Sequence, residues 1–270
     1  METTRDRSHQ CNGGRIGMSG RIFSRSNSSI SDRRRHRTVC TNLKRSIGAV
    51  VLAATVNLRG GVLASSNPLE LNGGSCLAMA GKGCVALAVD RRFGLEGQLV
   101  STKAKRVLKV NGQLLCGFTG LWTDVMTVMQ DLSSEVALKN LAEGDHPISP
   151  AALAGLLSTM LYSRRSSPFF VEPIVAGLDS RGRPYLCGQD ILGAPVEVND
   201  FVVAGTSAQS LYGTCEAFFR VEMDREELFR VASRCLLSAL ERDCLSGYGA
   251  VVHLITAEGI ETRELTTRMD

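Results

Sequence analysis

The sequence predicts an α+β fold with four layers, in which two antiparallel sheets pack face to face and helices cover the outer face of each. The hydrophobic pattern is the first observation: from residue 71 onward, hairpins, two helices, further hairpins, two helices and a last hairpin follow one another. Composition is the second, because 44% of the 270 residues are apolar and 21% are charged, which suffices for one large core or two modest ones. We expect one domain over residues 71–270.

Two hairpins begin this domain. Strands are predicted at 75–80 (SCLAMA), where apolar residues alternate, and at 84–89 (CVALAV), where they are nearly continuous. A second pair, at 106–110 and 114–120, flanks an Asn-Gly dipeptide, which strongly favours a tight turn between antiparallel strands.

Two helices are predicted next, one from Trp122 to Leu141 and one from Pro150 to about Ser163. Apolar residues recur along the first of them and predict its buried side. The residues expected on that side are Val125, Met129, Leu132, Val136 and Leu141.

The second half of the domain repeats these elements. Its predicted strands lie at 172–179, 184–190, 200–206, 249–255 and 260–265. A helix is expected to begin at Ser207, and a long amphipathic helix is expected over 225–242. The inner face of that long helix is predicted to contain Leu228, Val231, Ala232, Cys235, Leu236 and Ala239.

Residues 1–70 differ in composition from the rest of the chain. They hold twelve Lys and Arg against four Asp and Glu, and the Ser/Arg-rich part shows no hydrophobic period and cannot fold alone. We expect a disordered basic extension, a pro-segment or an artefact of the predicted gene start. The apolar stretch at 47–56 is too short to span a bilayer, so no membrane segment is predicted.

Several classes of site are excluded because their motifs are missing. The four histidines are far apart, and no Cys and His residues have metal-ligand spacing, so neither a metal nor another cofactor is predicted. No phosphate-binding glycine loop and no GxSxG turn occur, and aromatic residues, at 5%, are too scarce for nucleic-acid stacking. The nine cysteines form no CxxC pair and are interpreted as reduced, mostly buried thiols of an intracellular protein.

Two short stretches with chemical potential remain. Asp90 lies in an Asp-Arg-Arg sequence at the end of a predicted strand, and Asp243 and Ser246 lie in ERDCLSGYGA, after the long helix. Together they resemble the proteasome beta-subunit family, which consists of N-terminal-nucleophile hydrolases with an αββα sandwich. The stretches NGG…DRRFG, EPIVAGLD and FVVAGT are most similar to the beta type-3 branch of that family, and the resemblance extends over 71–270.

The resemblance implies a site that has lost its nucleophile. In active members a threonine precedes the strand-end aspartate by sixteen residues and a lysine follows it by sixteen, and these positions hold Gly74 and Arg106 here. Glycine has no nucleophilic group, and arginine stays protonated at any working pH. A non-catalytic subunit with a vestigial site is therefore expected. The frame of that site consists of Gly74, Asp90, Arg106, Thr206, Asp243 and Ser246.

Structural roles are expected for the residues that this frame retains. Asp90 is expected to pair with Arg92 or Arg106 and to bind loop amides, because a buried ion pair that loses one partner costs about 3–5 kcal/mol. Thr206 is expected to be the N-cap of the following helix.

The alternative is a working hydrolase whose nucleophile is shifted to Ser75 or Cys76. Ser75 is one residue out of register, and a shift by one turns a strand side chain to the opposite face. Cys76 faces the correct side but would lie about 6–7 Å further along the strand.

The resemblance also implies partners. Beta type-2 and beta type-4 subunits would be the neighbours, with alpha-ring subunits on one face, the opposite beta ring on the other, and assembly chaperones, in the cytoplasm and nucleus. No cofactor, nucleic acid or membrane is implied. Asp190 falls where the family contributes an acidic residue to the substrate pocket of the neighbouring trypsin-like subunit, although Ala194 replaces a cysteine often found there. Capping of a turn is the alternative role for Asp190.

Overall fold

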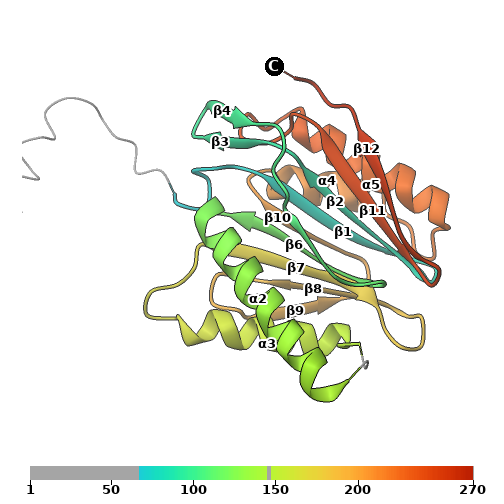
Figure 1. The fold of residues 1–270 in the computed structure, drawn as a ribbon. Helices are drawn as coiled ribbons and strands as arrows, with labels where there is room; N and C mark the ends of the chain where they lie inside the picture. Colours follow the sequence, from blue (N-terminus) through green and yellow to red (C-terminus); the bar gives the residue numbers. More distant parts are fainter. Residues whose placement is uncertain (1–66, 145–146, 270) are drawn as a thin grey trace, which may run out of the picture. The chain divides into compact units, whose positions relative to one another are not determined.

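The computed structural model describes residues 67–144 and 147–269. These residues form two five-stranded antiparallel sheets that lie face to face, with a pair of helices outside each (Figure 1). The first sheet consists, in order, of β10 (Phe201–Gly205), β1 (Ser75–Gly81), β2 (Cys84–Asp90), β11 (Ala250–Thr256) and β12 (Gly259–Leu265).

The second sheet is also antiparallel, but its five strands are consecutive in the sequence. Its order is β5 (Val107–Asn111), β6 (Leu114–Gly120), β7 (Val171–Leu178), β8 (Pro184–Gln189) and β9 (Pro195–Val198). A separate short hairpin consists of β3 (Phe93–Leu95) and β4 (Gln98–Ser101). The helices are α2 (Trp122–Glu143), α3 (Pro150–Ser163), α4 (Ala208–Phe218) and α5 (Arg225–Leu240).

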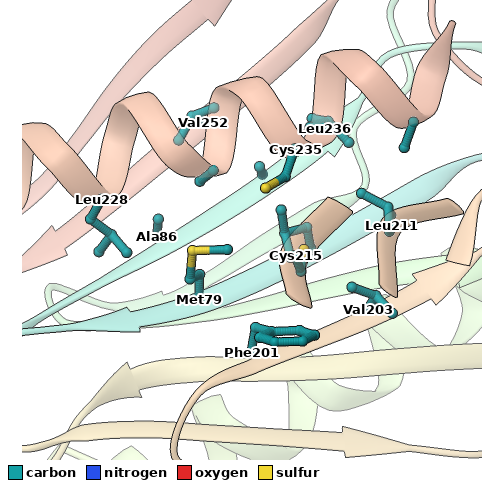
Figure 2. Packing of buried hydrophobic residues seen from close by; sticks show 14 of the residues in the cluster. Met79, Ala86, Phe201, Val203, Leu211, Cys215, Leu228, Cys235, Leu236 and Val252 are labelled. Carbon is teal, nitrogen blue, oxygen red and sulfur yellow. The ribbon is translucent and has the colours of Figure 1, made fainter. Parts of the chain in front are cut away.

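One hydrophobic cluster fills the space between the first sheet and its helices. In Figure 2, Leu228, Cys235 and Leu236 of α5 face the sheet, where Met79 and Ala86 lie below them. These five side chains are fully buried, so α5 is held by the apolar side that the sequence predicts.

Alternation along β1 separates this cluster from the one between the sheets. Leu77 and Met79 pack toward α5, whereas Cys76 and Ala78 pack toward the second sheet. This is the two-residue period of a strand that is buried on both faces. A third cluster lies beneath α2 and α3.

The predicted fold class is confirmed, and so are the nine predicted strands and four helices, to within a few residues at their ends. The prediction missed β3, β4 and β9, which have only three or four residues each and are mostly exposed. Strands this short carry too few alternations to be recognised.

One predicted core residue is wrong. Leu141 is 83% exposed, and the buried side of α2 contains Val128 instead. At 3.6 residues per turn, Leu141 lies about 160° around the helix from Val125, so it faces away from the sheet. Met129 is partly buried.

The cysteines agree with the prediction that most of them are buried thiols. Six of the seven in the described part of the chain are buried, and all seven are free thiols, but Cys244 is exposed. Within residues 67–144 and 147–269, no helix is both apolar enough and long enough to cross a bilayer. The predicted basic extension lies outside the described residues, apart from its last four positions.

Candidate functional site

The candidate site lies where β1 begins and β2 ends. Loops that precede β5, follow β10 and follow α5 meet at this point, although they are far apart in the sequence. They bring together all six predicted frame residues, which are Gly74, Asp90, Arg106, Thr206, Asp243 and Ser246.

Asp90 is fully buried at the centre of this cluster. Its Oδ1 lies 2.9 Å from Nε of Arg106 and accepts a hydrogen bond from the amide of Ser75 at 3.0 Å, and its Oδ2 accepts one from the amide of Gly247 at 3.2 Å. Burial raises the pKa of Asp90, while Arg106 and the amides act in the opposite direction. The carboxylate thus connects three loops.

Arg106 holds the chain before β1 and the segment after β2 through their carbonyl groups. Its Nη2 donates to the carbonyl oxygens of Gly73 at 2.8 Å and Arg92 at 2.7 Å, and its guanidinium carbon lies 5.7 Å from the centre of the Trp122 ring. The predicted pairing of Asp90 therefore involves Arg106. Arg92 instead donates to the carbonyl oxygens of Leu245 and Glu96.

The guanidinium of Arg106 occupies the space beside Gly74. A Cβ atom on Gly74 would lie 2.2 Å from Cζ, 2.4 Å from Nη2 and 2.6 Å from Nη1 of Arg106, which is far inside van der Waals contact. Gly74 also has φ +125°, a conformation that side chains other than glycine's rarely adopt. The space that a side chain at position 74 would take is therefore filled by the arginine.

Thr206, Asp243 and Ser246 form a second, partly buried group next to Gly74. The hydroxyls of Thr206 and Ser246 donate to Oδ2 of Asp243 at 2.5 and 2.6 Å. Thr206 also donates its amide to the carbonyl oxygen of Gly74 at 3.0 Å. The predicted N-cap role of Thr206 is wrong: the cap position of α4 is Ser207, and the Thr206 hydroxyl binds Asp243.

The two alternative nucleophiles are both buried. Ser75 is 0% exposed, and its hydroxyl accepts a hydrogen bond from the Ser207 hydroxyl at 2.5 Å. Its partner in this contact is thus another hydroxyl and not the base that would activate a nucleophile. Cys76 is also 0% exposed and lies in the core between the sheets. Burial raises the pKa of its thiol well above the usual value, which disfavours the nucleophilic thiolate.

Sequence reasoning missed how Asn72 and Trp122 contribute. The Asn72 side chain donates to the carbonyl oxygen of Gly94 at 2.9 Å and accepts from the amide of Trp122 at 2.9 Å. It thereby fixes the chain before β1 between the β3–β4 hairpin and the start of α2. The conformation of a loop decides these contacts, so no sequence pattern predicts them.

Asp190 lies apart from this cluster, in the turn after β8. Its Oδ1 accepts hydrogen bonds from the amides of Leu192 at 2.9 Å and Ala194 at 2.8 Å. The side chain is exposed, and no hydrogen bond to its Oδ2 occurs within the described residues.

The arrangement offers structural contacts rather than a reaction centre. It contains a buried ion pair between Asp90 and Arg106, and two hydroxyls that both donate to the Asp243 carboxylate. In the described ranges, no group of three or more His, Cys, Asp or Glu side chains has the geometry to hold a metal ion.

Comparison with known proteins places this geometry in context. The model of the family described as "Proteasome subunit" matches residues 70–255. The chain is 43% identical over 201 residues to proteasome subunit beta type-3-B of Arabidopsis thaliana, covering 74% of this chain and 98% of that protein. It is 42% identical to proteasome subunit beta type-3 of Picea mariana over the same shares, and 43% identical to that of Trypanosoma brucei brucei over 75% of this chain and 98% of the relative.

Proposed function

The chain belongs to the proteasome subunit family, and from this premise we propose that it occupies the beta type-3 position of the core with a vestigial site that acts as a scaffold. It is a non-catalytic beta subunit and assembles with other subunits into the proteasome core. What we propose is which residues account for the missing activity, namely Gly74 and Arg106.

The observation that carries this proposal is the overlap between Arg106 and the side-chain position of Gly74. A threonine nucleophile would need that space, and an arginine cannot accept the proton that a nucleophilic hydroxyl must release. Asp90, Asp243 and Ser246 then serve to hold the loops, since each makes hydrogen bonds or ion pairs within the cluster.

We further propose the neighbours that the family resemblance implies. These are beta type-2 and type-4 subunits within the ring, alpha subunits on one face and the opposite beta ring on the other, with assembly chaperones during formation. The cytoplasm and nucleus are the proposed locations. Residues 1–70 are proposed as an extension or pro-segment before a proteasome beta-type domain at 71–270, in agreement with the start of the family match at residue 70.

Asp190 is proposed to contribute charge to the substrate pocket of the trypsin-like neighbour. Its exposure and the arrangement of its two oxygens support this role: Oδ1 holds the turn, which leaves Oδ2 available for an external cation. The capping contacts and the pocket role are therefore compatible.

The test uses native particles that contain the full chain. Epoxyketone and boronate probes, which trap N-terminal threonines, should label other beta subunits and leave this chain unmodified. Intact mass should give an amino terminus upstream of Asn72, because Gly74 provides no hydroxyl for self-cleavage at the Gly73-Gly74 bond. A probe adduct within 73–76, or a mature chain that begins at Ser75 or Cys76, would contradict the scaffold proposal.

A further inference from the structure

A groove of about 440 Å³ opens between the two sheets along one edge of the sandwich. The edge strands β5 and β12 border it, and each of them pairs with only one neighbouring strand. The groove lies away from the Asp243 group and contains none of the hydroxyls described above.

The groove has an apolar floor and a basic rim. Its floor residues are Val89, Val107, Leu115, Val251 and Ile260. Its exposed or half-buried cationic residues are Arg91, Lys103, Lys105 and Lys109, and Glu264 is its one carboxylate within the described residues. Arg106 also lines it, but this residue is buried and paired with Asp90.

Most of the charge on the rim is unbalanced. Arg91 pairs with Glu264 at 3.0 Å, whereas no ion pair within the described residues involves Lys103, Lys105 or Lys109. All three lysines are exposed, and they lie on β5 or on the segment just before it. The rim therefore carries a row of three free ammonium groups.

The remaining polar residues do not offset this charge. The His253 ring shares a hydrogen bond with the Thr262 hydroxyl at 2.9 Å, and burial lowers the pKa of His253. The histidine is thus neutral at physiological pH, so it neither adds to the positive charge of the lysines nor offsets it. The net charge of the groove lining is strongly positive.

We propose that this groove docks an extended, acidic segment of a neighbouring protein chain in the assembled core. Charge complementarity selects carboxylates for Lys103, Lys105 and Lys109. The apolar floor favours a segment in which acidic and apolar side chains alternate. The unpaired edges of β5 and β12 have backbone N–H and C=O groups that an extended strand could bind through hydrogen bonds.

The chain's own N-terminal extension does not fit this description. Residues 1–70 carry twelve Lys and Arg against four Asp and Glu, so the rim would repel them. Lysines on an edge strand also serve in many proteins to prevent unwanted strand pairing. In that simpler role the lysines would remain exposed to solvent in the assembled particle. Their rate of acetylation in the particle distinguishes the two roles.

The test is lysine footprinting of the intact native particle. The inference rests on the assembly of the chain into the proteasome core that is given under the proposed function. Acetylation of Lys103, Lys105 and Lys109 should be about tenfold slower than in the dissociated, denatured chain, which corresponds to ~1.4 kcal/mol of protection. A carbodiimide, which joins an amine to a carboxylate in direct contact, should link at least one of these lysines to Asp or Glu of another subunit. The mass spectra that report acetylation also show whether the chain is present in the particle. A chain that does not assemble is therefore distinguished from a chain that assembles with an open groove.

Variants at one lysine provide the matched control. Lys109→Glu should reduce incorporation of the chain into particles more than Lys109→Met, because methionine keeps an apolar stem. Replacement of the cross-linked Asp or Glu of the other subunit by Lys should restore the incorporation of the Lys109→Glu variant. Lysines that react in the particle as fast as in the denatured chain would overturn the proposal. Protection without any carboxylate cross-link would also overturn it, because the covering segment would then not be acidic.

Discussion

The guanidinium of Arg106 lies where the side chain of residue 74 would begin, with Cζ only 2.2 Å from the position of a Cβ on Gly74. Asp90 and the carbonyl groups of Gly73 and Arg92 hold the guanidinium there. Glycine at 74 and arginine at 106 are therefore one structural feature, because the arginine fits only where no Cβ exists.

Replacement of Gly74 by alanine tests this relationship. The added methyl group must displace a buried guanidinium and also adopt φ +125°, so Gly74→Ala should lower the free energy of unfolding of the full-length chain by about 2–4 kcal/mol. Urea denaturation measures the change. Gly97→Ala is the matched control, since a Cβ there meets nothing within 4 Å. Equal effects of the two substitutions would refute the overlap.

The double variant Gly74→Ala/Arg106→Lys tests whether the two positions are coupled. Lysine retains the positive charge beside Asp90 but lacks the broad guanidinium, so it leaves room for a Cβ at 74. We expect the double variant to be more stable than the sum of the single variants predicts, by about 0.5–3 kcal/mol. Additive effects in urea denaturation would show that the side chain of Arg106 does not restrict residue 74.

Asp190→Asn tests the proposed contribution to the neighbouring pocket. The asparagine oxygen still accepts from the amides of Leu192 and Ala194, so the turn is preserved while the charge is removed. Cleavage after basic residues by assembled particles should fall about tenfold, since each 1.4 kcal/mol changes a rate by a factor of ten. Cleavage after apolar residues should be unchanged.

Asp200→Asn is the matched control for this experiment. Asp200 is also exposed and accepts a backbone amide, that of Phe201, but it precedes β10, at the end of that strand remote from Gly205. If Asp190→Asn particles assemble normally and cleave after basic residues like the control, Asp190 is only a turn cap.

A pH dependence is expected from the ion pairs between α5 and β12. Arg263 donates to both carboxylate oxygens of Glu226 at 2.6 and 2.9 Å and to Glu261 at 2.7 Å, and Arg225 also pairs with Glu261. Hydrogen bonds from Arg263 lower the pKa of both glutamates below the usual 4.5. Because the folded pKa is the lower one, this stabilisation is present above pH 4.5 and is lost as the pH falls through the folded values.

The corresponding measurement is the urea midpoint of the full-length chain between pH 6 and pH 3. Arg263→Gln should flatten the decline in this range, while Arg181→Gln, in the exposed β7–β8 turn, should leave it unchanged. A decline of the same steepness in both variants would exclude these glutamates as its cause.

The sequence by itself determined the layers of this protein. Alternation in 75–80 and the Asn-Gly turn before β6 predict hairpins, and the apolar positions of α5 predict which side is buried, because these patterns depend only on the local period of the backbone. At 3.6 residues per turn, the helical period also places Leu141 on the exposed side of α2. Spacing from Asp90, together with the family resemblance, also predicts that Gly74 and Arg106 are the changed positions.

Only the tertiary structure decided what these residues do. It selected Arg106 over Arg92 as the partner of Asp90, assigned the Thr206 hydroxyl to Asp243, and buried Cys76 between the sheets. It also placed Lys109 of β5, with the two lysines just before that strand, beside the apolar edge of the other sheet to form the basic groove. Each of these contacts joins loops or strands that are distant in the chain. Their geometry follows from how the two sheets pack, which no local period encodes.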